Sequence, residues 1–64
     1  MNTPASTLSV PGLEAVYDTL AEAIDRAGPD KAELFLVKLA LLNAHSLGDA
    51  GRFAEHVQAV LKDL

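Results

Sequence analysis

The chain has 64 residues, no cysteine and a formal net charge of −4 at pH 7. A chain this short forms one domain, and without cysteine it has neither disulfides nor thiolate metal sites to stabilise it. With 5 basic and 9 acidic residues, it is poorly suited to bind nucleic acid or an anionic membrane, because both are bound largely through Lys and Arg.

Residues 1–10 are rich in Ser, Thr and Pro and have no apolar periodicity, so we predict a flexible leader there. This segment lacks the basic residues and the apolar run of a secretory signal peptide. We therefore expect a cytoplasmic protein whose single helical domain covers residues 11–64.

The first predicted helix spans about residues 11–27. Pro11 suits its first turn, because backbone N–H groups there have no hydrogen-bond partner within the helix and proline lacks this group. Gly28-Pro29 ends it, because proline disfavours helical geometry in the residue before it. Apolar residues recur along this helix at the i, i+3, i+4 spacing and form one stripe, which contains Leu13, Val16, Tyr17, Leu20, Ile24 and Ala27.

Two short connections predict the remaining helices. Asp30, with Glu33 three residues later, resembles a capping box for the second helix. Gly48 suits the left-handed position just after that helix, and Asp49 can cap a third helix over about residues 50–63. No segment alternates as a strand does. We predict an all-α fold, a three-helix antiparallel hairpin bundle that homodimerisation completes.

The second predicted helix carries more apolar surface than two short neighbours can cover. On a helical wheel of about 100° per residue, a narrow apolar face lies beside a broad one. The narrow face holds Phe35, Leu39 and Leu42, with Lys38 at its edge, and we expect a homodimer to bury it. The broad face, expected to pack on the other two helices, holds Leu34, Leu36, Val37, Ala40, Leu41, Ala44 and Leu47.

Four acidic residues gather on the side of the first helix away from its apolar stripe: Glu14, Asp18, Glu22 and Asp25. The simpler interpretation is a solvated helix face. The alternative is a docking strip for a basic partner, or for Lys31 and Lys38 of a second copy.

The two histidines do not predict a metal site, because His45 and His56 are far apart in sequence and a zinc site needs three or four convergent ligands. The segment Ala44–Gly48 resembles the phosphorylated segment of histidine phosphotransfer domains, with His45 as the phosphoacceptor, but it lacks the lysine before the glycine. No cofactor motif is present, and the four glycines lie at helix boundaries rather than in a phosphate-binding loop.

Over about residues 13–62 the chain resembles a family of short proteobacterial proteins catalogued as a domain of unknown function. The resemblance lies in a leucine-rich helix, residues 38–42, followed by a segment that ends in Leu47-Gly48-Asp49. It implies an accessory role beside catabolic, flavin-dependent oxidoreductases and assigns no catalytic residue. We therefore expect a non-catalytic helical interaction or accessory protein that acts by self-association and partner binding. The alternatives are a dimeric phosphotransfer module that uses His45, or a small subunit of such an oxidoreductase.

Overall fold

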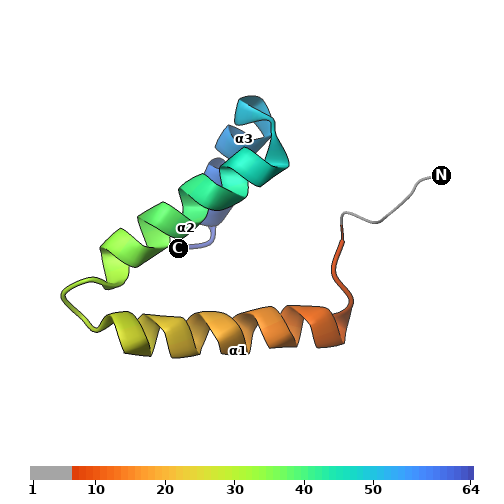
Figure 1. Ribbon diagram of the computed structural model, residues 1–64. Coiled ribbons are helices and arrows are strands. Elements are labelled where there is room, and N and C mark those ends of the chain that lie inside the picture. Colours follow the sequence, from red (N-terminus) through yellow and green to blue (C-terminus); the bar gives the residue numbers. More distant parts are fainter. Residues whose placement is uncertain (1–6) are drawn as a thin grey trace. The chain divides into compact units, whose positions relative to one another are not determined.

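The computed structural model describes residues 7–64, which form three α-helices and no strand (Figure 1). Helix α1 spans Val10–Ala27, α2 spans Ala32–Leu47 and α3 spans Ala50–Lys62. The predicted all-α class is therefore confirmed for this part of the chain. The greater part of the leader predicted over residues 1–10 lies outside the described residues.

Helix α1 begins one residue earlier than the sequence predicts, because Ser9 caps it. The Ser9 backbone is extended, and its Oγ accepts a hydrogen bond from the Gly12 N–H at 3.1 Å. The Ser9 carbonyl also accepts from the Leu13 N–H at 2.8 Å, which closes the first turn. Pro11 lies within this turn, as predicted. The hydroxyl thus supplies a partner for one of the N–H groups that a helix start leaves unpaired.

The end of α1 depends on the backbone of Gly28. Its N–H donates to the carbonyl of Ile24 at 3.1 Å, and its φ and ψ are 82° and 160°. The positive φ turns the chain out of the helix, while the extended ψ is the one that a following proline favours. Together these angles fall in a region that is essentially restricted to glycine. Gly28-Pro29 therefore ends α1 as predicted.

The predicted capping box at Asp30 is wrong. The chain forms a turn in which the Lys31 N–H donates to the Gly28 carbonyl at 3.1 Å, and α2 begins only at Ala32. Pro29 and Asp30 are the central residues of this turn. Asp30 therefore precedes the position in the chain from which a residue could cap α2. Glu33 still lies in the first turn of α2, where its charge suits the helix dipole.

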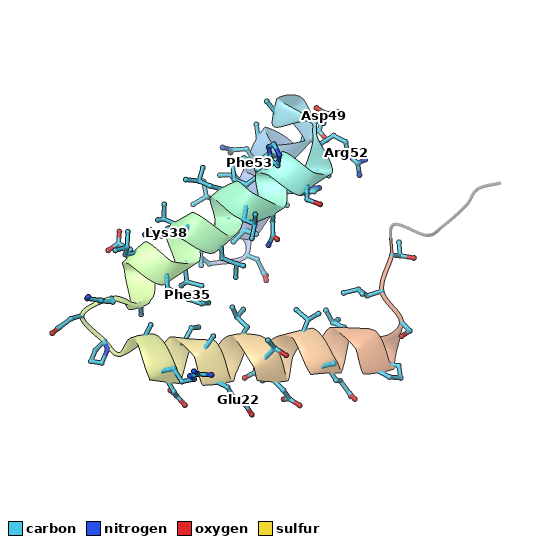
Figure 2. All side chains as sticks on the ribbon, viewed as in Figure 1. Glu22, Phe35, Lys38, Asp49, Arg52 and Phe53 are labelled. Carbon is cyan, nitrogen blue, oxygen red and sulfur yellow. The ribbon has the colours of Figure 1, made fainter. Side chains whose placement is uncertain are left out.

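The connection between α2 and α3 has the predicted form. Gly48 has a φ of 73°, and its N–H donates to the Ala44 carbonyl at 3.0 Å. Asp49 is extended and caps α3, since its Oδ1 accepts from the Arg52 N–H at 3.0 Å (Figure 2). Two consecutive residues thus end one helix and begin the next, which reverses the chain within a very short segment.

The Asp49→Ala variant tests this cap. We expect it to lower the free energy of unfolding by about 0.5–2 kcal/mol, because the Arg52 N–H loses its partner. Thermal unfolding followed by circular dichroism measures the effect. Asp49→Ser is the matched control, since serine also accepts from a helix N–H and should leave the midpoint nearly unchanged. Equal losses of stability in both variants would show that the Asp49 carboxylate stabilises the protein by something other than capping α3.

The chain divides into two compact units, Met1–Glu33 and Leu34–Leu64. The first contains α1, and the second contains nearly all of α2 together with α3. None of the described residues is fully buried in either unit. Helix caps and turns, rather than a buried core, are therefore the best-defined interactions within each unit. The single domain predicted over residues 11–64 stays a prediction.

Candidate interaction surface

Three of the exposed apolar residues of α2 form a stripe. Leu34, Val37 and Leu41 are 53%, 48% and 63% exposed. Their i, i+3, i+7 spacing places them within an arc of about 60° on the helix. We call these three residues the open stripe. The sequence analysis assigned them to the broad face that was expected to pack on other helices.

The narrow face predicted as the interface is only partly exposed. Phe35 and Leu39 are half-buried, whereas Leu42 is 65% exposed. Lys38 is also exposed, and on the helical wheel it lies between Leu42 and the open stripe. Figure 2 labels Phe35 and Lys38 along the first half of α2. Leu42 therefore lies on one side of Lys38 and the open stripe on the other.

The half-buried residues of α2 identify its more covered side. Besides Phe35 and Leu39 they include Ala40, Ala44 and Leu47, and on α3 Phe53 is half-buried as well. Leu36 is slightly more exposed, at 39%, and lies on the same side of the helix. The covered side of α2 therefore combines large apolar side chains with two small alanines, and other large residues of the helix remain exposed.

Helices α1 and α3 also carry exposed apolar side chains. On α1 these are Val10, Leu13, Val16 and Tyr17, while Leu20 and Ile24 are half-buried. On α3 the large exposed apolar residues are Val57, Val60 and Leu61, and Leu64 follows the helix. Both helices thus have large apolar side chains in contact with water, and on α1 most of these belong to the stripe that the sequence predicts.

The predicted acidic strip of Glu14, Asp18, Glu22 and Asp25 is exposed along its whole length on α1. Figure 2 labels Glu22, which projects from this helix. Exposure of all four carboxylates fits a solvated face, and it is also what a docking strip requires, so the docking strip stays a prediction. Like charges at i, i+4 spacing destabilise a helix by only a few tenths of a kcal/mol, which the rest of α1 easily tolerates.

The two histidines are exposed on different helices, His45 in the last turn of α2 and His56 on α3. Among residues 7–64, no group of three or more His, Asp or Glu side chains is arranged to hold a metal ion. His45 occupies the end of the helix where a positive charge is favoured by the dipole. A helix-terminal role is therefore a sufficient physical reason for a histidine at this position.

Sequence reasoning missed one feature in each unit of the chain. The first is the Ser9 cap, for which the polar residue just before Val10-Pro11 was the available signal. The second is the open stripe. Its regular spacing is visible in the sequence, but a helix face covered by a neighbouring helix would show the same spacing. Only the burial of individual side chains separates those two interpretations.

No family model matches the chain, and no curated protein or solved structure is significantly similar to it. The resemblance to the short proteobacterial family therefore stays a prediction. Within the described residues, no helix combines the length and the apolar character that crossing a bilayer requires.

Proposed function

We propose that this chain is a non-catalytic helical interaction or accessory protein that acts by associating with a second copy of itself and with a partner protein. One observation carries the proposal. No residue among 7–64 is fully buried, while fourteen large hydrophobic side chains are exposed. So much exposed apolar surface favours association, which is the route by which a short chain without disulfides gains stability.

We propose further that the three helices form an antiparallel hairpin bundle and that dimerisation completes its core. Helix α2 supports this arrangement, because its apolar residues surround most of its circumference, whereas α1 and α3 each offer one stripe. In such a bundle α2 takes the central position. The short connections at Gly28–Lys31 and at Gly48-Asp49 are typical of helices that neighbour one another in antiparallel bundles.

We propose that the dimer contact consists of apolar residues on either side of Lys38, with Lys38 between them. The predicted interface of Phe35, Leu39 and Leu42 contributes chiefly Leu42, because the two other side chains are already half-buried. The open stripe supplies the remaining apolar area. Fully burying one leucine stabilises by about 1.5–3 kcal/mol relative to leaving it in water. Lys38 itself can approach an acidic residue on α1 of the second copy, which favours one orientation more than it adds affinity.

Light scattering coupled to size exclusion tests the proposal directly. At high micromolar concentration we expect a species of twice the 6.7 kDa mass of one chain. On dilution this species should give way to the monomer, because a contact of a few leucines on each side is modest in area. A single 6.7 kDa species throughout the concentration series would contradict self-association.

Histidine phosphotransfer through His45 is the second candidate, and the exposure of this side chain is the observation that favours it. Incubation with a small-molecule phosphodonor distinguishes the candidates. A purely interacting protein should acquire no acid-labile phosphate. Labelling that is lost in His45→Ala but kept in His56→Ala would instead identify a phosphotransfer module, and labelling lost equally in both variants would indicate non-specific modification of exposed imidazoles.

A further inference from the structure

We draw no further inference here: the strongest candidate, the open stripe of Leu34, Val37 and Leu41 on α2, belongs to the self-association surface already proposed, and nothing in the structure shows which other partner covers it.

Discussion

Replacing Leu41 with glutamate is expected to convert the proposed dimer into a monomer. A two-fold contact places two copies of Leu41 in the interface, and each has 63% of its surface left to bury, so the loss is about 2–4 kcal/mol, or roughly thirtyfold or more in the dissociation constant. Folding of each chain should be retained, since Leu41 is 63% exposed and glutamate is nearly as good a helix former as leucine. Sedimentation equilibrium measures the dissociation constant, and circular dichroism checks the helix content.

Leu64→Glu is the matched control, because it makes the same chemical change at a residue that is 95% exposed beyond the end of α3. It should leave the dimer intact, as should Glu14→Gln on the acidic strip. Leu39→Glu provides a further comparison. Because Leu39 is half-buried, this variant should lower the thermal midpoint as well as association. A dimer that survives Leu41→Glu but is lost in Leu39→Glu would favour the narrow face over the open stripe.

Replacing Gly28 with alanine is expected to destabilise the chain more than the same replacement at any other glycine. Gly28 has φ 82° and ψ 160°, a combination that costs other residues about 1–3 kcal/mol. A Cβ added there meets no atom within 4 Å, so the loss reports backbone strain rather than a clash. For a domain of this size, 1 kcal/mol corresponds to roughly 4–8 °C in the midpoint of thermal unfolding.

Two further glycine variants calibrate this result. Gly48→Ala should cost about 1 kcal/mol, because the φ of Gly48 is 73°. No atom lies within 4 Å of the added Cβ, so here too the cost comes from backbone strain and not from a clash. Gly51→Ala, in the first turn of α3, should change the midpoint little, because two effects oppose one another. Alanine is the better helix former, but its Cβ would lie 3.3 Å from the Asp49 Oδ1 that caps the helix. If the midpoints of Gly28→Ala and Gly48→Ala both matched the wild type, neither helix end would adopt a positive φ, which would contradict the helix ends described above.

The helix ends show how far local sequence predicts structure. The predictions for Gly48 and Asp49 are confirmed because the hydrogen bonds involved are local. The Arg52 N–H donates to the Asp49 carboxylate three positions earlier, and the Gly48 N–H donates to the Ala44 carbonyl four positions earlier. Asp30 was predicted wrongly for an equally local reason. A competing turn from Gly28 to Lys31 uses the same residues, and the capping pattern does not reveal which of the two arrangements is more stable.

The candidate interaction surface was less predictable. The helical wheel separated the two apolar faces of α2 but placed Leu34, Val37 and Leu41 among the residues to be covered. In the structure these three are exposed, while Phe35 and Leu39 are half-buried. A wheel records directions around one helix, and it contains no information about where a neighbouring helix lies.

The sequence by itself determined the all-α class, the approximate limits of three helices and the residues that end them. It could do so because apolar periodicity, glycine conformation and capping bonds act within about one turn of helix. Only the tertiary structure decided which side of α2 is covered and which carries the open stripe. Burial depends on contacts between residues distant in sequence, and in a helix that is apolar on most sides, several packings satisfy the same pattern.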